Sequence, residues 1–274
     1  MRSQAKEKEL FETMPVTRAI AELAFPSIMG QIILVIYNMA DTFFVGLTRS
    51  DEMITAVTVC MPAFMFLSAI SNLFGVGGAS VISRFLGSHN RESAGRTSAF
   101  AIWGCMAVTT FFAWVFMDSF VNLLGGGNNP VVHNEACRYM TIAVVIGGVV
   151  TALNTLFSHL VRAEGRSMQA SIGIMLGGIL NMALDPLFMF VILPRGNEVV
   201  GAALATMLSN VAALIYFIII IVKNRRVLVL SAKPEAAMFR DKIPSAVISI
   251  GIPACLMTLC ENISYAILDN LMSL

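Results

Sequence analysis

The sequence predicts an all-α polytopic membrane protein, and three observations support this fold class. Hydrophobic residues make up 57% of the 274 residues and charged residues only 13%, whereas soluble domains carry about 25% charged residues. The mean hydropathy is +0.79. The apolar residues also form seven runs, each long enough for the ~20 residues that a helix needs to cross a bilayer. Period-2 alternation, typical of membrane barrel strands, is absent, so the runs should be helices.

Each predicted span is an apolar run between charged or turn-forming stretches. The first run follows a charged N-terminal segment, and the loops between the next five are short, with sequences such as "GGGNNP" and "RAEGRS". The seven spans are expected at about 18–47, 53–83, 97–124, 133–161, 168–193, 199–222 and 244–272. These spans suggest four parts: a cytoplasmic segment 1–17, a six-helix lobe 18–222, a basic cytoplasmic linker 223–243, and the first helix of an incomplete second lobe, 244–274.

The basic residues predict the orientation. If the N-terminus lies inside, 15 of the 18 Lys and Arg residues fall on the inner side. Cytoplasmic loops carry an excess of Lys and Arg, so we expect a multi-pass protein of the plasma (cytoplasmic) membrane with its N-terminus inside. Only three basic residues would lie outside: Arg49, Arg138 and Arg195.

A weak repeat supports the division into two lobes. The first and seventh spans both carry an early proline, at Pro26 and Pro253. Both also carry a tyrosine four residues before an aspartate, at 37/41 and 265/269. Both spans start on the inner side, which is typical of repeats related by an axis along the membrane normal. The linker between the lobes could be a plain connection or could contact anionic lipids.

Polar residues of three spans lie at one predicted depth. Asp41 is six residues before the outer end of the first span, and Asp185 is eight before the outer end of the fifth. Thr206 is about seven residues after the outer start of the sixth. At ~1.5 Å per residue, all three lie roughly 9–12 Å below the outer surface, as a shared pocket would require.

Helical spacing places further polar residues near these three. Residues three, four or seven apart share a helix face. Gln31, Asn38 and Asp41 form such a stripe, and Tyr37 flanks it. The remaining pairs of this kind are Asn181 with Asp185 and Thr206 with Asn210.

Two carboxylates at matched depth favour a functional site over structural hydrogen bonding between helices. Intramembrane carboxylates cost about 2.5–3.5 kcal/mol on insertion scales and usually mark ion or proton pathways. A carboxylate removed from water, or placed beside a second one, binds a proton more readily. Asp41 and Asp185 therefore suit exchange of H⁺ or Na⁺ against an organic cation, with Asn181 and Thr206 completing an ion shell. Tyr37 could hold a flat lipophilic cation.

Other features suggest mechanics rather than chemistry. Pro26 interrupts the first span and Pro186 follows Asp185 directly; a proline inside a helix permits a bend, so both are candidate hinges. The five cysteines and three histidines form no CxxC pair or ligand cluster, so we expect no cofactor and no metal other than a coupling Na⁺. A membrane enzyme would need a nucleophile–base pair or a metal motif, and HExxH and GxSxG are absent. We therefore predict a non-enzyme that has no nucleic-acid partner.

Four stretches together resemble the MATE (multidrug and toxic compound extrusion) family. They are "FPSIMGQIILVIYNMADTFFVG", "GVGGASVISRFLGSHNRESA", "HLVRAEGRSMQAS" and "GGILNMALDPLFMF". The resemblance covers residues from about 15 to the end. It implies cation-coupled efflux of lipophilic, often cationic compounds by alternating access, in a fold of twelve spans in two six-helix lobes.

The resemblance also implies roles for single residues. Asp41 and Asp185 match coupling residues, with Asn181 and Thr206 nearby. Asn154 matches a further cavity position, although the depth arithmetic places it lower. Glu261 matches an acidic position of the second lobe.

The chain departs from the family in length, because it ends after the seventh span. We expect a fragment, a truncated product or an assembly of two chains that needs a second lobe as its partner, and we expect no transport by residues 1–274 alone. Two alternatives stay open: a lipid-linked oligosaccharide flippase of related fold, which would want basic residues inside the bundle, and a non-transporting lobe.

Overall fold

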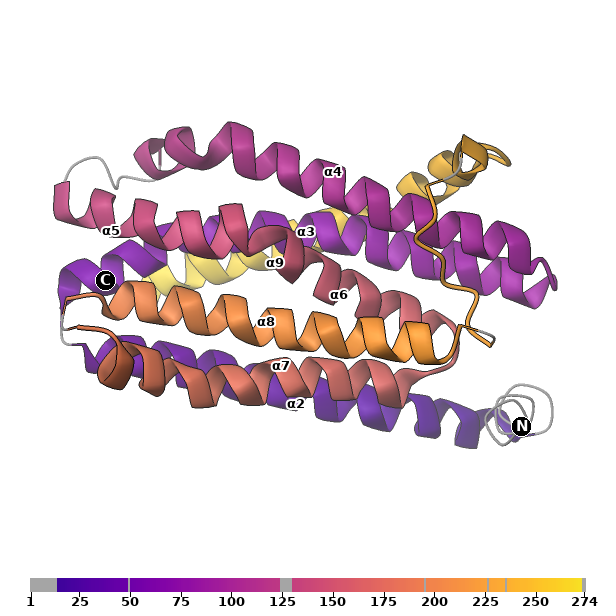
Figure 1. Cartoon of the computed structure of the whole chain (residues 1–274), viewed down its shortest axis with the longest axis horizontal. Coiled ribbons are helices and arrows are strands. Elements are labelled where there is room, and N and C mark those ends of the chain that lie inside the picture. Colours follow the sequence, from indigo (N-terminus) through magenta and orange to yellow (C-terminus); the bar gives the residue numbers. More distant parts are fainter. Residues whose placement is uncertain are drawn as a thin grey trace.

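The computed structural model describes residues 14–48, 50–123, 130–194, 196–225, 227–234 and 236–272. Within these ranges every regular element is a helix (Figure 1). The elements are α2 (Val16–Leu47), α3 (Asp51–Gly87), α4 (Arg91–Leu123), α5 (Pro130–Met140), η3 (Thr141–Ile146), α6 (Gly148–Ala163), α7 (Ser167–Pro186), η4 (Leu187–Ile192), α8 (Glu198–Lys223), η5 (Ala236–Phe239) and α9 (Ile243–Met272). Most of the predicted segment 1–17 lies outside the described residues, as do Arg49, Arg195, Arg226 and the side chains of Tyr265 and Asp269.

The helices confirm the predicted fold class. Six described helices are long and apolar enough to cross a membrane, and a seventh span results if α5–η3 and α6 are taken together. Large hydrophobic side chains such as Phe25, Trp114 and Val191 are exposed on the outside of the bundle, where lipid would solvate them. The chain is therefore a multi-pass membrane protein.

The fourth span is bent, which the continuous apolar run 133–161 did not predict. The chain passes from α5 into the π-helix η3, and the two halves of the span meet at an angle of 48°. The N–H of Gly147 donates to the carbonyl of Ile142, five residues back, at 2.9 Å. This widened turn breaks the regular α-helical pattern, and hydrophobicity alone cannot reveal it.

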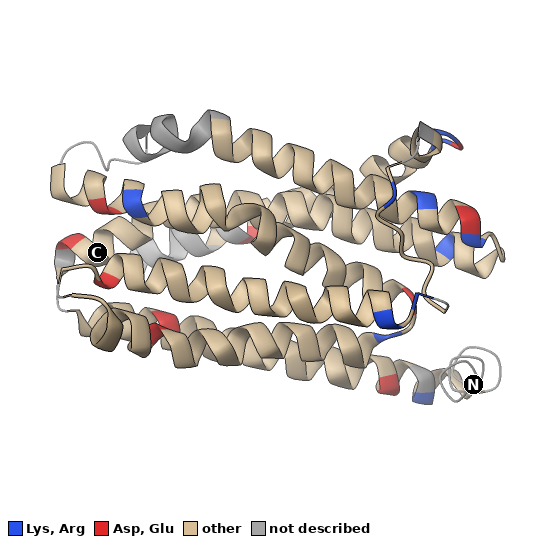
Figure 2. Cartoon of the chain, in the orientation of Figure 1, with Lys and Arg blue, Asp and Glu red and all other residues tan. Residues whose placement is uncertain are grey.

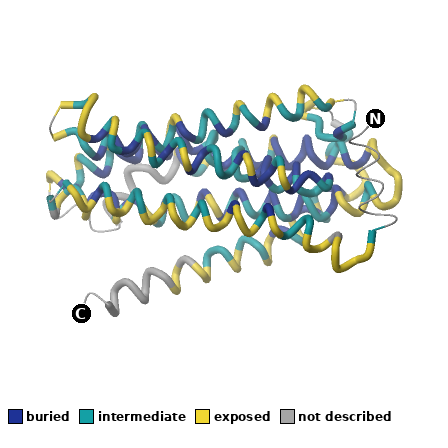
Figure 3. The backbone as a smooth tube through the Cα atoms, turned by 90° about the horizontal axis from the view of Figure 1, so that it is seen from below, coloured by how far each residue is buried: buried dark blue, intermediate teal, exposed yellow. Residues whose placement is uncertain are grey.

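Helix α9 packs closely on α3 through glycines. A Cβ atom on Gly251 would lie 2.0 Å from the carbonyl oxygen of Leu73, and one on Gly77 would lie 2.3 Å from that of Val247. Only glycine permits this close approach of two backbones. Beyond the crossing, the described part of α9 separates from the other helices toward its C-terminal half (Figure 3).

A hydrogen-bonded chain links α9 to the bundle near this crossing. The side-chain amide of Asn72 in α3 donates to the hydroxyl of Thr258 in α9 at 2.8 Å. The amide oxygen of Asn72 lies 3.1 Å from Nε2 of His159 in α6. Three helices are thus joined by polar groups, which adds specificity to the apolar packing.

The predicted linker 223–243 is bound to the bundle over part of its length. Residues 227–234, which we call the strap, run from the end of α8 across α4 (Figure 1). The hydroxyl of Ser98 accepts from the N–H of Ser231 at 2.8 Å, and the indole of Trp103 donates to the carbonyl of Ala232 at 3.0 Å. The buried carboxylate of Glu164 accepts from the N–H groups of Val229 and Leu230 at 2.9–3.1 Å.

Basic residues gather at one end of the bundle, the end at which α2 begins (Figure 2). Arg91, Arg162, Arg166 and Lys223 lie at helix ends on this side. At the opposite end, Arg138 is the one basic residue among the described parts of the chain. This distribution matches the one on which the predicted orientation rests.

Candidate functional site

Small residues bring α2 against α7 and so define the position of the site. A Cβ atom on Gly178 would lie 3.4 Å from Tyr37, and one on Gly30 would lie 3.4 Å from Ser171. Such contacts allow two helices to run side by side over several turns. Figure 2 shows acidic positions of α2 and α7 next to each other in the half of the bundle away from the basic end. Asp41 and Asp185 are close enough to interact electrostatically.

Asp185 is held in place by Asn181 and Thr206. Its side chain is fully buried, and Asn181 is 2% exposed. The amide nitrogen of Asn181 donates to Oδ1 of Asp185 at 3.4 Å and to the hydroxyl of Thr206 at 3.3 Å. The four-residue spacing in α7 puts Asn181 one turn before Asp185, so one amide links α7 to α8.

Three oxygen atoms at this site are buried and lack a donor among the described residues. They are Oδ1 of Asp41, Oδ2 of Asp185 and Oδ1 of Asn181. A buried acceptor without a partner costs about 1–3 kcal/mol, and more if it is charged. Such groups point to an ion, a proton or a water molecule at the site. The arrangement is rich in acceptors and poor in donors, which suits a positively charged ligand.

Two tyrosines line the same region. Tyr37 of α2 and Tyr139 of α5 both lie within electrostatic range of Asp41 and Asp185. Tyr139 is 4% exposed and packs edge-on against Phe64 at a centroid distance of 5.9 Å. Sequence reasoning missed Tyr139, although it lies six residues after the expected outer start of the fourth span at residue 133, which gives the same depth as Asp41 at ~1.5 Å per residue.

A second polar chain joins α6 and α8. Asn154 donates from its amide to the amide oxygen of Asn210 at 3.0 Å, and Asn210 donates to the hydroxyl of Thr151 at 3.1 Å. The amide oxygen of Asn154 is buried and has no donor within the described ranges. Asn210 lies one turn beyond Thr206 in α8, so this chain continues the first one deeper into the bundle. Thr151 was not singled out from the sequence.

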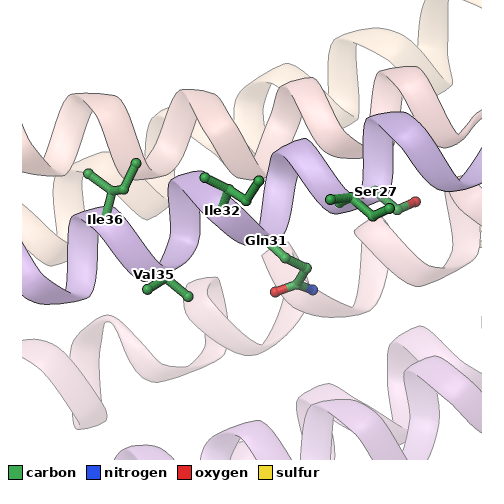
Figure 4. A pocket seen from close by; sticks show the side chains of 6 residues that line it. Ser27, Gln31, Ile32, Val35 and Ile36 are labelled. Atoms are coloured by element: carbon green, nitrogen blue, oxygen red, sulfur yellow. The ribbon is translucent and has the colours of Figure 1, made fainter.

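The structure does not bring Gln31, Asn38 or Glu261 into this cluster. Gln31 and Asn38 are exposed on α2, and Glu261 is exposed on α9. Gln31 lines an open groove of about 450 Å³ along α2 together with Ile28, and Figure 4 shows its amide beside apolar neighbours. The three residues predicted to share one face of α2 therefore differ in direction: Asp41 faces α7, whereas the amides of Gln31 and Asn38 face outward.

The two candidate hinges differ. Pro26 is buried within α2, which continues as one helix from Val16 to Leu47. Pro186 ends α7, and the π-helix η4 follows it directly. Proline lacks the N–H that a regular helix would use, and π-turns inside helices are frequent at functional sites. The change to π-helical hydrogen bonding begins two residues after Asp185.

The oxygen atoms that could bind an ion at this site fit a proton or Na⁺. The part of the chain that the structure describes holds no group of three His, Cys, Asp or Glu side chains that could bind a metal ion. Carboxylate, amide and hydroxyl oxygens are hard ligands, whereas transition metals prefer imidazole or thiolate. Na⁺ would be a transported ion here and not a resident cofactor.

Comparisons with known proteins relate this chain to one family. Residues 26–187 match the MatE family. The multidrug export protein MepA of Staphylococcus aureus (strain MRSA252) is 32% identical over 272 residues, which are 96% of this chain and 58% of that protein. MepA of Staphylococcus haemolyticus (strain JCSC1435) is 30% identical over 267 residues, which are 94% of this chain and 57% of that protein.

Solved structures share the fold. An outward-facing multidrug resistance MATE transporter of the MOP superfamily matches with a TM-score of 0.83 and 25% identity, over 97% of this chain and 57% of that one. A MOP superfamily transporter from Pyrococcus furiosus, described as having a binding pocket of reverse polarity, matches with a TM-score of 0.82 and 25% identity, over the same shares of the two chains. The present chain thus spans a little over half the length of these relatives.

The structure is a bundle of membrane-spanning helices in which Asp41 lies near the fully buried Asp185, which defines the class as a polytopic membrane protein. The chain belongs to the MatE family. The relatives named above are transporters or export proteins, which confirms both the predicted resemblance and the prediction that the chain is not an enzyme.

Proposed function

We propose that this chain provides the ion-coupling lobe of a cation-coupled antiporter that exports lipophilic, often cationic compounds by alternating access. The coupling ion is H⁺ or Na⁺, and the exported compounds are small organic cations. The protein lies in the plasma membrane with its N-terminus inside, and a second lobe completes the transport path. Support for the exported class comes from the relatives that are named multidrug export proteins.

One observation supports the coupling role: buried acceptor oxygens of α2 and α7 lie near each other, and no described residue donates to them. Two carboxylates at one place cannot both stay charged and dry without a compensating cation. Binding of H⁺ or Na⁺ removes this repulsion, and release of the ion restores it. The occupancy of the site is therefore coupled to the free energy of holding α2 against α7.

The Asn181 contacts suggest how the ion would be held. The amide fixes one oxygen of Asp185 and leaves Oδ2 of Asp185 and its own Oδ1 unpaired. These oxygens, Oδ1 of Asp41 and the hydroxyl of Thr206 are the groups that would bind the ion. Oxygen ligands suit either H⁺ or Na⁺. Because the exported compound is also a cation, it and the coupling ion compete for the same negative charge.

The exposed residues of α2 suggest where a substrate would lie. Gln31 and Asn38 are exposed, and Tyr37, the residue before Asn38, lies within electrostatic range of both carboxylates. An organic cation on this face could contact the tyrosine ring and feel the charge of Asp41. Glu261 on α9 would contribute from the other side of a complete transport path.

Dye efflux tests the proposal. Drug-sensitive cells would express residues 1–274 with and without any coding sequence that follows, as wild type and as Asp41→Asn and Asp185→Asn. Ethidium export by wild type is expected to fall to background in both variants. The matched control is Asp241→Asn, which removes a partly exposed carboxylate paired with Arg96 at 3.3 Å and should export normally.

Two outcomes would overturn parts of the proposal. Export by Asp41→Asn and Asp185→Asn at the wild-type rate would show that the carboxylates only stabilise helix packing. Failure of every form to export, despite membrane insertion, would leave a non-transporting lobe. The coupling ion would be identified in membrane vesicles by imposing an H⁺ or a Na⁺ gradient in turn.

A further inference from the structure

A second polar pocket lies at the basic end of the bundle, away from the carboxylate site. It is a groove of about 450 Å³ between the start of α2 and the ends of α3 and α6. Ile20, Leu23 and Ala24 form its apolar wall, while Arg162 and Ser167 supply polar groups on the opposite side. The proposed transport mechanism uses none of these residues.

Arg162 is the unusual member of this pocket. Its Nε and Nη2 atoms are buried and have no hydrogen-bond partner among the described residues. Two other arginines at the same end have partners: Arg96 bonds Glu92 at 2.6 Å, and Arg91 donates to the carbonyl of Val227. A buried guanidinium normally pairs with carboxylate or phosphate, because its donors form a planar fork that fits these anions.

The neighbouring polar groups do not neutralise Arg162. The carboxylate of Glu164 is directed to the backbone of Val229 and Leu230. The hydroxyl of Ser83 donates to the carbonyl of Ala163 at 3.3 Å. Nε2 of His159 lies against Asn72. Among the described residues, these three polar groups have partners other than Arg162, so the groove presents a guanidinium whose Nε and Nη2 lack an acceptor there.

The apolar wall of the groove indicates which class of anion would bind beside Arg162. Ile20 is 60% exposed, and the exposed side chains of Phe25 and Ile28 continue the apolar surface along α2 toward the middle of the membrane. A free inorganic anion would gain nothing from this wall. An amphiphile with a phosphate at one end and an acyl chain at the other matches both parts, and basic pockets between spanning helices are a known way to bind such headgroups.

We propose that this groove binds an anionic phospholipid, with its headgroup phosphate on Arg162 and an acyl chain along Ile20 and Leu23. The lipid anchors the start of α2 to the ends of α3 and α6. It would thereby stabilise the helix that carries Asp41 without entering the carboxylate site.

Lipid titrations of the purified protein in a neutral detergent test this proposal. Phosphatidylglycerol should raise the thermal unfolding temperature, while phosphatidylcholine and inorganic phosphate should have little effect. Arg162→Gln should weaken the apparent affinity for phosphatidylglycerol about fivefold, the effect expected of one basic residue near an anionic lipid. The matched control is Arg225→Gln, an exposed arginine at the same end outside the groove.

A second variant keeps the test decisive if Arg162→Gln folds poorly. Ala24→Phe fills the groove and retains the arginine, so it should also abolish the response to phosphatidylglycerol. An unchanged response in these variants would overturn the proposal, as would equal losses in Arg162→Gln and Arg225→Gln. Stabilisation by inorganic phosphate equal to that by the lipid would show a free-anion site instead.

Discussion

Two buried carboxylate sites at opposite ends of the bundle differ in how their oxygens are satisfied. At the basic end, Glu164 is 6% exposed, and its two oxygens accept from the N–H groups of Val229 and Leu230. In the other half, Asp185 is fully buried, yet its Oδ2 and the Oδ1 of Asp41 have no donor among the described residues. Both sites place acids out of water, but only the first supplies permanent partners.

This difference separates a structural carboxylate from an exchangeable one. Backbone donors cannot leave, so Glu164 holds the strap in place whatever the protein binds. Missing donors can be replaced by a proton, an ion or a charged ligand, and the replacement is reversible. We therefore propose that the absence of fixed partners, and not burial, distinguishes the coupling carboxylates.

The largest expected effect is the loss of transport in Asp185→Asn without loss of folding. The substitution keeps the shape of the side chain and removes a buried charge that lacks a second donor, so thermal stability should stay the same or rise. Efflux should fall to background. A variant that loses both folding and efflux would place Asp185 in the same structural class as Glu164.

Glu164→Ala should show the opposite pattern. Two backbone N–H groups would lose their acceptor, each at a cost of roughly 1–3 kcal/mol, and the strap should separate from the bundle. Amide hydrogen exchange of Val229 and Leu230 should then accelerate, while that of α7 near Asp185 stays unchanged. Glu164→Gln, which retains one carbonyl acceptor, is the control and should preserve most of the protection.

The pH dependence of stability should sharpen the contrast. Burial raises the pKa of the Glu164 carboxyl to about 7, although its hydrogen bonds to Val229 and Leu230 and the charges of Arg166 and Arg91 oppose the rise. The folded protein thus holds this proton at a pH at which the unfolded chain, with a value of 4.5, has lost it. Proton binding by Glu164 therefore stabilises the folded protein relative to the unfolded chain. This stabilisation is fully present below pH 4.5 and is lost as the pH rises through about 7.

Thermal unfolding of wild type and Glu164→Gln from pH 4 to 9 measures this effect. Relative to the glutamine variant, wild type should lose on the order of 3 kcal/mol across the window, since one pKa unit corresponds to about 1.4 kcal/mol. Parallel curves for the two proteins would contradict the assignment.

The smallest expected effect concerns Thr206. Thr206→Val removes the hydroxyl that accepts from Asn181 at 3.3 Å and should reduce efflux several-fold, because a hydrogen bond contributes about 1 kcal/mol. Thr206→Ser retains the hydroxyl and should transport normally. Equal activity of the valine and serine variants would remove Thr206 from the site.

The sequence predicted the spans well because their signal is local. Runs of apolar residues and the bias of the basic residues need no knowledge of packing. The depth arithmetic also selected Asp185 and Thr206, and helical spacing added Asn181; the structure joins these three residues by hydrogen bonds. Depth in the membrane follows from the rise per residue and the number of residues to the end of a span, so it requires no knowledge of how the helices pack.

Features that depend on contacts between distant residues were not predictable in this way. A stripe of residues three, four or seven apart is too broad to show that Asp41 faces α7 while Asn38 faces outward. The bend at Gly147 follows from a hydrogen bond to Ile142 that hydrophobicity does not encode. The hydrogen bond from the N–H of Val229 to the carboxylate of Glu164 joins residues 65 positions apart, and only the folded chain brings them together.

The central claim is that the Asp41–Asp185 site holds an exchangeable cation. The most direct measurement is release of that cation by the purified protein when ethidium is added, recorded in parallel with a pH-sensitive dye and with radiolabelled Na⁺. We predict release of H⁺ or Na⁺ by wild type and by Glu164→Gln, and none by Asp41→Asn with Asp185→Asn. Equal release from the double variant, or loss of release in Glu164→Gln alone, would contradict the account.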